Sequence, residues 1–507
     1  MMTIEEFLVP IDSRADAERA DAMEALLRGE LSKEDFETLN NIRKMTNKDS
    51  MTRHETAVRT AKMKGGIWAH PLTVDTMLGI FSSPLPPEMP EDCMPRPVKA
   101  ALWNTPSLFR PSYSQCIFPP YGTLPNGVSF EYINGKIYEP KLNAVQVAPS
   151  GIGKNSISEI NNHILVDVCR ESEENLDKMV EHNEQNICLP DNSQKKRRPK
   201  DLPQRIVFAD TTFPALCTQM KEAQGKFCFL EAKEIEDLYN LQSGRGGKSP
   251  LVILREADDP DGRIRQRRVG EKSVTVDVPL RLNYVISTTP AGAQDFYKKD
   301  TIKGGLSRAE MTTIVKPEIG YEEPVFGRYD EKYDIRLRPF IDNLTNAHGL
   351  IVCKRAQQLA RQLKKECQEF LSVTSDPVWD DLTHRALTHA FLKACIIYVA
   401  NGCKWDPNTE PFIRWSFFYC MWVKCHYFMD AIRDAESRVA ISKRGATNKL
   451  TLIPYNIFSF EDVQKMRKEQ GLDDSKEPTT NQINVWVNRK YIVRLSDGRF
   501  EKVKFKS

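Results

Sequence analysis

The chain has 507 residues, of which 40% are hydrophobic and 28% are charged. This balance is typical of a globular protein of roughly two to four domains and excludes a fully disordered chain. The formal net charge of +3, from 72 basic and 69 acidic residues, favours no partner by itself. The first residues are acidic and lack the basic-then-apolar order of a signal peptide. The most apolar run, 412–432, is interrupted by charged residues such as Arg414 and Lys424, so we expect a buried helix and no membrane segment.

The 12 cysteines are scattered along the chain and contain no C-x-x-C pair. The closest two, Cys420 and Cys425, have no histidine at the spacing of a zinc site. This pattern predicts free thiols in a reducing compartment, and therefore a cytoplasmic protein.

In chain order, the sequence predicts four segments. Residues 1–96 read as charged helices followed by a proline-rich linker at 82–97. In residues 97–340, apolar runs alternate with helical patterns from about 144 onward, which predicts an α/β core with a mostly parallel sheet, interrupted by a basic loop at 192–201. Residues 341–448 are helical in pattern, and residues 449–507 form a last small unit.

Within the α/β segment, residues 142–147 predict a strand and residues 156–168 a helix, with the loop "APSGIGKNS" between them. Strand, glycine-rich turn and helix is the context of the phosphate-binding P-loop G-x-x-x-x-G-K-[ST]. The glycines would let backbone N–H groups point at phosphate oxygens at the positive end of the helix dipole, and the lysine would reach the β- and γ-phosphates. We therefore expect ATP with Mg²⁺ at Ser150, Gly151, Ile152, Gly153, Lys154, Asn155 and Ser156.

Two positions depart from the P-loop pattern: Ala148 replaces the first glycine and Asn155 replaces the final hydroxyl residue. The alanine is a mild change, whereas the hydroxyl normally ligates Mg²⁺. An amide oxygen can also ligate Mg²⁺, from a longer side chain, and Ser156 would substitute only if the register shifted. The alternative is a glycine-rich turn without a ligand. A Lys154 side chain buried against a carboxylate, or a turn that points away from any cleft, would argue against nucleotide binding both for a motor and for assembly.

An ATPase of this type needs an acidic residue at the end of a neighbouring strand. Residues 227–230 predict that strand, and Glu231 and Glu234 follow it. Glu234 is the candidate for polarising the attacking water, with Glu231 as the alternative or the acid beside the metal. An acidic helix start, with glutamates near the positive end of the dipole, is the competing interpretation.

Further along the chain, a predicted strand at 280–289 ends in Ser287, Thr288 and Thr289. Polar side chains at that end would sense the γ-phosphate, with Thr288 and Thr289 as the candidates. Arg308 follows a Gly-Gly pair, and arginine suits the stabilisation of developing phosphoryl charge, often from a neighbouring subunit. An isolated arginine is far more often a surface residue.

Between the acidic segment and these threonines, residues 263–269 and 274–278 predict a hairpin with a turn at 270–272. Its first strand would present to a nucleic-acid backbone the side chains of Arg263, Arg265, Arg267 and Arg268. A charged edge strand that resists aggregation explains the same residues equally well.

The last 67 residues, 441–507, contain 14 Lys and Arg against 8 Asp and Glu, which suggests a polyanionic partner. A helix at 459–470, a second helix from Thr479 or Thr480, and a ribbon around Asp497-Gly498 predict a winged helix. The residues expected to face a DNA groove are Asn481, Gln482, Asn484, Arg489 and Lys490, and those expected to face phosphates are Arg494, Arg499 and Lys502. A winged helix used for protein contact is the alternative.

The order of these motifs resembles a domain family of originally unknown function found in primase–helicase-type ATPases of bacterial mobile elements and phages. The resemblance covers about residues 97–311 and is carried by "VAPSGIGKNS", "IVFADTTFPALCTQM", "FCFLEAKEIEDL", "SPLVILREA", "VPLRLNYVISTTP" and "GGLSRAEM". It implies a fold similar to superfamily 3 hexameric helicases, with Lys154 on phosphate, Glu234 activating water and Arg308 acting across a subunit boundary.

This resemblance implies an ATP-dependent DNA-handling protein, helicase-like, in replication or mobilisation of a mobile genetic element or phage. Its expected partners are DNA, further copies of the chain (a hexamer by analogy), and a separate primase, because no Asp-x-Asp pair lies between strands here. The departures are Asn155, Lys233 before the acid, and Ser287-Thr288-Thr289-Pro290 where relatives often have Gly-Thr-Pro. The alternative is a non-hydrolysing, initiator-like DNA-binding scaffold whose nucleotide site stabilises assembly.

Overall fold

The computed structural model describes residues 65–188, 199, 202–242, 249–266, 275–297, 308–317, 320–443, 450, 452–488 and 491–503. The chain divides into two compact units, Met1–Phe428 and Met429–Ser507, which are considered separately below. The helices predicted before residue 64 and nearly all of the predicted basic loop at 192–201 lie outside the described residues.

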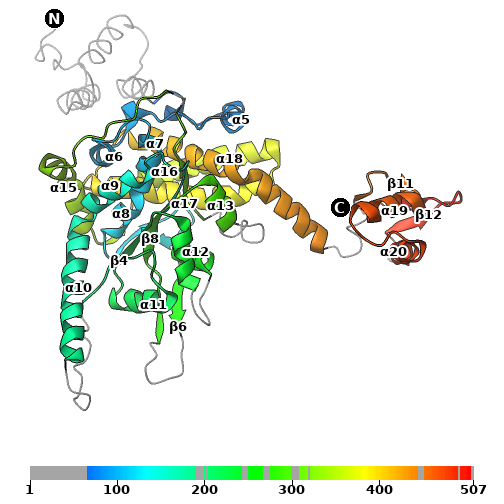
Figure 1. Cartoon of the computed structure of the whole chain (residues 1–507). Coiled ribbons are helices and arrows are strands. Elements are labelled where there is room, and N and C mark those ends of the chain that lie inside the picture. Colours follow the sequence, from blue (N-terminus) through cyan, green and yellow to red (C-terminus); the bar gives the residue numbers. More distant parts are fainter. Residues whose placement is uncertain are drawn as a thin grey trace, which may run out of the picture. The chain divides into compact units, whose positions relative to one another are not determined.

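The first unit is built on a five-stranded, all-parallel sheet in the order β4-β5-β8-β3-β9 (Figure 1). Every residue of β3 and β8 is buried, as expected for parallel strands covered on both faces. The mostly parallel α/β core predicted from the alternating apolar runs is therefore confirmed. The strands are β3 (Asn143–Val147), β4 (Ile206–Val207), β5 (Cys228–Ala232), β8 (Leu282–Thr288) and β9 (Met311–Thr313).

The strand register places the carboxyl ends of these strands at one edge of the sheet. Val147 lies opposite both Thr288 of β8 and Thr313 of β9, and Ala232 of β5 lies opposite Ile286. After β3 the chain crosses to β4 at one side of the sheet, and after β8 it crosses in the opposite direction to β9 at the other side. The direction of the crossovers therefore reverses between the neighbouring strands β8 and β3. Such a reversal between neighbouring strands is where open α/β sheets bind ligands, outside the carboxyl ends.

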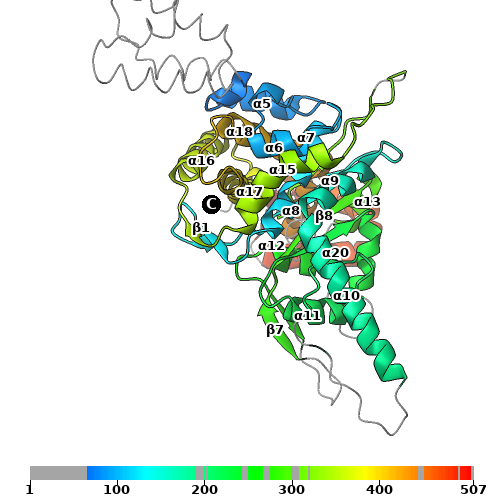
Figure 2. The same cartoon turned by 90° about the vertical axis from the view of Figure 1, so that its left-hand side faces the viewer.

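Helices cover the sheet, and α7 and α8 pack directly on it against β3 and β8. α9 follows the glycine-rich loop, and α10 continues as a long helix that extends away from the sheet (Figures 1 and 2). The helices of the α/β part are α7 (Arg110–Cys116), α8 (Phe118–Thr123), α9 (Ile157–Ile164), α10 (Val166–Ile187), α11 (Phe213–Glu222), α12 (Pro250–Asp258) and α13 (Pro290–Phe296). The short helix α6 (Arg96–Ala101) packs instead against the helical layer described next. Short 3-10 turns are η3 (Lys154–Ser156) and η4 (Ile235–Gln242).

The segment predicted to be helical forms a layer within the same unit. It contains α15 (Glu331–Thr345), α16 (Lys354–Thr374), α17 (Pro377–Ala400) and α18 (Thr409–Lys443). A small sheet crosses the predicted boundary at residue 340, because β1 (Val128–Glu131) pairs with both β10 (Gly349–Ile351) and β2 (Ile137–Tyr138). The segments 97–340 and 341–428 therefore belong to one compact unit.

Residues 411–424 of α18 are buried on every side, so the buried helix predicted at this apolar run is confirmed. Among the helices of the described residues, none is both long enough and apolar enough to cross a membrane.

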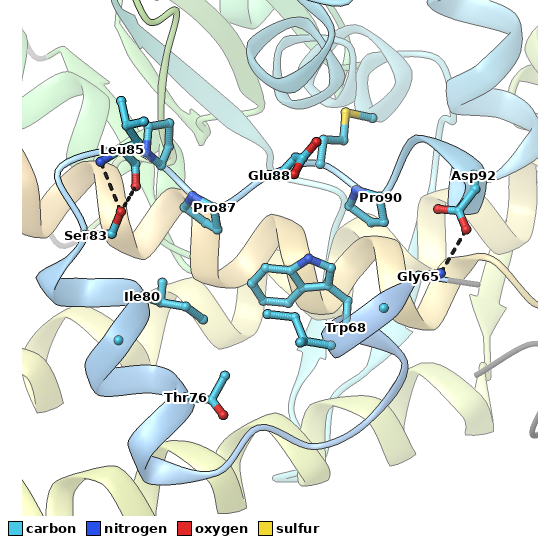
Figure 3. A pocket seen from close by; sticks show the side chains of 15 residues that line it. Gly65, Trp68, Thr76, Ile80, Ser83, Leu85, Pro87, Glu88, Pro90 and Asp92 are labelled. Atoms are coloured by element: carbon cyan, nitrogen blue, oxygen red, sulfur yellow. Dashed lines mark hydrogen bonds between the residues drawn. The ribbon is translucent and has the colours of Figure 1, made fainter. Parts of the chain in front are cut away.

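The proline-rich segment at 82–97 is not the linker that its composition predicts. It follows α5 (Val74–Ser82), includes η2 (Glu91–Cys93), and packs along α18. The indole N–H groups of Trp415 and Trp422 donate to the carbonyls of Pro87 and Ser83, each at 3.0 Å. Beside this contact lies a hollow of about 560 Å³, into which Trp68 of η1 (Gly66–Ala69) and Ile80 point (Figure 3). Proline imposes extended backbone here, and the two tryptophans hold the partly exposed residues 83–87 against α18, while Met89, Cys93 and Met94 are buried.

The second unit holds the element order predicted for the tail, with one additional strand. Its three-stranded antiparallel sheet has the order β11-β13-β12. α19 begins with a capping box between Ser459 and Asp462, and Gly471 follows it at φ +67°. The elements are β11 (Ile457–Phe458), α19 (Phe460–Glu469), α20 (Lys476–Asn488), β12 (Ile492–Arg494) and β13 (Phe500–Lys502).

The predicted start of the second helix at Thr479 or Thr480 is wrong, because α20 begins at Lys476. The Thr479 hydroxyl donates to the carbonyl of Ser475 at 2.9 Å, and that of Thr480 to Lys476 at 2.7 Å. Inside a helix such hydroxyls bond back to the preceding turn instead of capping the N-terminus.

Candidate nucleotide site

The loop after β3 continues the sheet for one residue and then turns sharply into a helix. The Ala148 N–H donates to the Thr288 carbonyl at 3.0 Å. Gly151 and Gly153 have φ of +78° and +88°, a left-handed backbone that side chains disfavour. A Cβ atom on Gly151 would meet nothing within 4 Å, so conformation rather than space requires the glycine. The turn then runs through η3 into α9 at the carboxyl edge of the sheet, which is the predicted strand–turn–helix arrangement.

Lys154 and Glu234, predicted from separate motifs, lie beside each other at this edge. The Nζ atom of Lys154 is 3.4 Å from Oε2 of Glu234. The lysine side chain is 7% exposed and the glutamate side chain 51% exposed, so the contact lies at the boundary with solvent.

The structure thus buries Lys154 against a carboxylate, the arrangement expected to argue against nucleotide binding. The partner of Lys154, however, is the half-exposed acid assigned to the same site, and not a carboxylate of the protein core. A ligand phosphate can therefore replace Glu234 as the partner of Lys154 without leaving a buried charge unpaired.

Two aromatic residues of the α7 segment, which the sequence patterns miss, support the loop from below. The Tyr113 hydroxyl donates to the carbonyl of Gly153 at 3.1 Å and lies 3.4 Å from that of Lys154. The same hydroxyl is hydrogen-bonded to Ser156, and burial raises the pKa of Tyr113. The ring of Phe109 lies 3.6 Å from where a Cβ atom of Gly153 would stand. Ser156 is therefore turned toward Tyr113, and no signal in the sequence connects residues 109–113 to the loop.

Of the two predicted metal residues, Glu231 is engaged by α9 and Asn155 is open to solvent. Glu231 lies within β5 and not after it, and its carboxylate accepts hydrogen bonds from the Ser158 hydroxyl and, at 3.0 Å, from the Asn161 amide of α9. Asn155 is exposed. In the described part of the chain, no group of three or more His, Cys, Asp or Glu side chains could hold a metal ion. The strand places Glu231 against α9 because its side chain alternates with those of its neighbours.

Thr288 and Thr289 lie at the same edge, next to the start of the loop. The Thr288 hydroxyl is buried and donates to the Thr289 carbonyl at 3.2 Å, while the Thr289 hydroxyl caps α13 by accepting from the Gly292 N–H at 3.1 Å. A Cβ atom on Gly292 would stand 2.9 Å from an oxygen of Glu236, an exposed acid on η4. Glu236 is thus a third acidic residue at this edge, which the sequence motifs miss.

Arg308 lies at the opposite edge of the sheet and is not brought to the loop. Its backbone carbonyl accepts from Asn143, the first residue of β3. Its guanidinium donates to Asp259 at 2.8 Å and to the Arg255 carbonyl at 3.0 Å. Partial burial alone would raise the pKa of Asp259, but Arg308 and Arg385 lower it. These contacts engage Arg308 within its own chain, and its predicted action across a subunit boundary stays a prediction.

A buried ionic cluster joins the sheet to the helical layer at this same opposite edge, where the amino ends of the strands lie. His389 of α17 lies 2.6 Å from an oxygen of Asp258 and 2.9 Å from one of Glu310, and Lys393 lies 3.7 Å from Glu310. Burial alone would lower the pKa of His389, but the two carboxylates raise it to about 8. Burial alone would raise the pKa of Glu310, but Lys393 and His389 hold it well below its usual range. A histidine donating to two carboxylates is doubly protonated.

The predicted DNA-binding hairpin forms, as β6 (Arg263–Gln266) and β7 (Val276–Pro279). Its arginines are engaged within it, because Arg263 and Arg265 approach Asp277 at 2.7 and 3.3 Å and lower the pKa of that carboxyl. Arg267 and Arg268 lie outside the described residues. The described part of this hairpin fits the charged edge strand as well as a phosphate contact.

In the second unit, the side chains predicted to read a groove also make internal contacts. Gln482 accepts a hydrogen bond from Arg467, and Asn484 accepts one from Arg494 at 2.7 Å. Asn481 is exposed on α20. Arg489 and Lys490 lie outside the described residues.

The cations predicted to contact phosphates in this unit are engaged too. Arg499 pairs with Asp497 at 2.7 Å, and Lys502 donates to the Ile453 carbonyl at 2.5 Å. Of the described residues predicted to face a DNA groove, Gln482 and Asn484 thus form side-chain hydrogen bonds within the unit. Asn481 is exposed and forms no such bond with a described residue.

Comparison with models of known protein families finds none that matches this chain, and a search of curated proteins finds no match either. The relationship to primase–helicase-type ATPases therefore stays a prediction from the order of the motifs, and the function is inferred below from the site.

Proposed function

We propose that this protein is an ATP-dependent DNA-handling protein, a helicase-like ATPase that holds the triphosphate of ATP on the loop from Ser150 to Ser156. The observation that carries the proposal is the contact of Lys154 with Glu234 at the carboxyl edge of the sheet. The two residues come from motifs about 80 positions apart, and they lie where an α/β sheet of this topology binds ligands.

In this proposal, ATP binding exchanges the partner of Lys154. The N–H groups of the loop and the start of α9 bind phosphate oxygens, and Lys154 moves from Glu234 to the β- and γ-phosphates. Glu234 is then a free carboxylate at the boundary with solvent, where it accepts the proton of the attacking water. Tyr113 and Phe109 hold the loop in place during the exchange. The Tyr113 hydroxyl donates to the Gly153 carbonyl, and the Phe109 ring packs beside Gly153.

A non-hydrolysing scaffold is the second candidate, and a specific observation favours it. Both oxygens of Glu231 already accept hydrogen bonds from α9, and Asn155 replaces the usual hydroxyl ligand of Mg²⁺. A site that binds the triphosphate but positions the metal poorly would stabilise assembly on DNA without turnover. Assembly into a ring and service to a mobile element or phage remain part of the proposal by resemblance, and Arg308 is not assigned a catalytic role in it.

The test measures ATP binding and ATP hydrolysis, with and without single-stranded DNA, for the wild type and for Lys154→Ala. The matched control is Lys226→Ala, which removes a lysine whose ion pair with Glu171, at 3.1 Å, lies away from the loop. DNA-stimulated hydrolysis that only Lys154→Ala abolishes supports the ATPase. Binding that Lys154→Ala abolishes, without hydrolysis in any variant, supports the scaffold. No ATP binding by the wild type would refute both.

A further inference from the structure

Helix α16 presents to solvent a face composed almost entirely of cations and glutamines. Its other side, which includes Leu359, Leu363 and Phe370, is buried in the helical layer. The exposed residues on α16, up to its last two turns, are Lys354, Arg355, Gln358, Arg361, Gln362, Lys364, Lys365, Gln368 and Glu369. Glu369 is the single acid in this set, so the face carries a strong positive charge.

Four of the five cations on this face form no side-chain hydrogen bond or ion pair with any described residue: Lys354, Arg355, Arg361 and Lys364. The fifth, Lys365, lies 3.7 Å from Glu369. This arrangement contrasts with the described arginines predicted to bind DNA. Those of the hairpin are engaged with Asp277, and Arg499 of the second unit is engaged with Asp497.

The cations follow the helix axis. Lys354, Arg361 and Lys365 are separated by seven and four residues, so they lie along one line of the helix and span roughly 16 Å. Duplex DNA carries about one phosphate charge per 1.7 Å of its axis, so several phosphates lie within reach of this line. α16 lies on the outer side of the helical layer (Figure 2), and the residues of this face are exposed.

The positive surface continues beyond α16 through Lys364. This lysine lines a hollow of about 500 Å³ together with Lys136 from the loop before β2 and Arg385 from α17. Asp259 and Asp261 line the same hollow, and Asp259 pairs with both Arg308, at 2.8 Å, and Arg385, at 3.7 Å. Lys364 and Lys136 are therefore the cations that extend the positive surface here.

We propose that this face of α16, extended by Lys136, binds the sugar-phosphate backbone of DNA. Cations in a line release counterions from a polyanion, and four of the five on this face form no ion pair with a described residue. The amides of the intervening glutamines can hydrogen-bond phosphate oxygens. The inference rests on the proposed function for the identity of the polyanion, and deepens it by placing a DNA contact on the first unit. It does not depend on whether ATP is bound or hydrolysed.

The test measures the affinity of the full chain for a labelled 20-nucleotide single strand, and for the corresponding duplex, as a function of salt. The variant is Arg361→Gln with Lys364→Gln, which removes two unpaired cations and keeps polar side chains. The matched control is Lys178→Gln with Lys332→Gln, which removes the same charge at exposed positions of α10 and α15. Affinity for a fluorescent ATP analogue is measured in parallel.

For the single strand, we expect the slope of log affinity against log salt to become shallower by about 1.4 in the variant, since each phosphate contact contributes about 0.7. If the variant and the wild type bind equally at 1 M salt, this change of slope makes the affinity of the variant about 25-fold lower than that of the wild type at 0.1 M salt. The control should retain the wild-type slope.

Equal slopes in the variant and its control would overturn the inference, as would competition by polyglutamate as strong as that by DNA of the same charge. If the wild type fails to bind the ATP analogue while the slopes behave as expected, the proposed ATPase fails and the DNA surface stands. If the analogue binds and the slopes are equal, only the DNA surface fails.

Discussion

Replacing Glu234 by glutamine removes the negative charge 3.4 Å from the Lys154 ammonium and keeps the size of the side chain. Because half of the glutamate is exposed, solvent screens the pair, and its net contribution is on the order of 0.2–1 kcal/mol. ATP must disrupt this contact to engage the lysine. The dissociation constant of ATP should therefore fall about 1.4- to 5-fold in Glu234→Gln. Hydrolysis should fall by on the order of 100-fold or more, since the variant lacks the general base.

The assay titrates each protein into a fluorescent ATP analogue and follows anisotropy, while phosphate release is measured separately. The control is Glu171→Gln, which breaks the ion pair with Lys226 away from the loop and should leave both quantities unchanged. Weaker or unchanged ATP binding in Glu234→Gln, with normal binding in the control, would show that Lys154 is not released from Glu234 and would refute the exchange. Normal hydrolysis would remove Glu234 as the base.

Three further variants probe the loop and the packing around it. Tyr113→Phe removes the hydrogen bond to the Gly153 carbonyl and should weaken ATP binding by roughly 1 kcal/mol, about fivefold. The control, Tyr121→Phe, loses a hydrogen bond to the Pro97 carbonyl and should leave ATP binding unchanged. Equal effects of the two variants would argue that Tyr113 does not position the loop. Gly153→Ala places a side chain at φ +88° and should destabilise the loop by about 1–2 kcal/mol, read as weaker ATP binding, whereas wild-type affinity would contradict the left-handed conformation. The His389 pKa is raised from 6.5 to about 8, so its stabilising effect is fully present below pH 6.5 and is lost as the pH rises through 8. Urea unfolding should therefore show a decrease of about 2 kcal/mol between pH 6 and 9, and a decrease of the same size in His389→Gln would exclude this histidine as its source.

Local patterns in the sequence were sufficient for the elements around the site. Apolar spacing predicts the strand at 142–147 and the helix after it, and the glycines between them predict a turn with a backbone that other residues disfavour. The structure contains these elements as β3, the loop and α9. The buried character of α18 follows in the same way from its apolar run. These properties depend on neighbours within a few positions of the chain.

The same patterns failed where long-range contacts override composition. The prolines at 82–97 suggest a linker, but Trp415 and Trp422 hold that segment against α18 from more than 300 positions away. Glu231 looks like a free acid after a strand, but the register of β5 turns it to Ser158 and Asn161. Arg308 looks like an isolated arginine in the sequence, but its place before β9 brings it to Asp259 at the opposite edge of the sheet from the loop.

The sequence by itself determined the α/β core, the glycine-dependent turn at 151–153 and the acidic and polar residues at the ends of strands, because backbone preference and apolar periodicity are local. Only the tertiary structure decided the partners of these residues. The tertiary structure brings Glu234 to Lys154 and places Tyr113 against the loop. It also leaves four of the five cations on α16 without an ion pair to a described residue, while the described arginines of the hairpin are engaged with Asp277. Strand order and helix packing depend on contacts between distant segments, which no single stretch of sequence encodes.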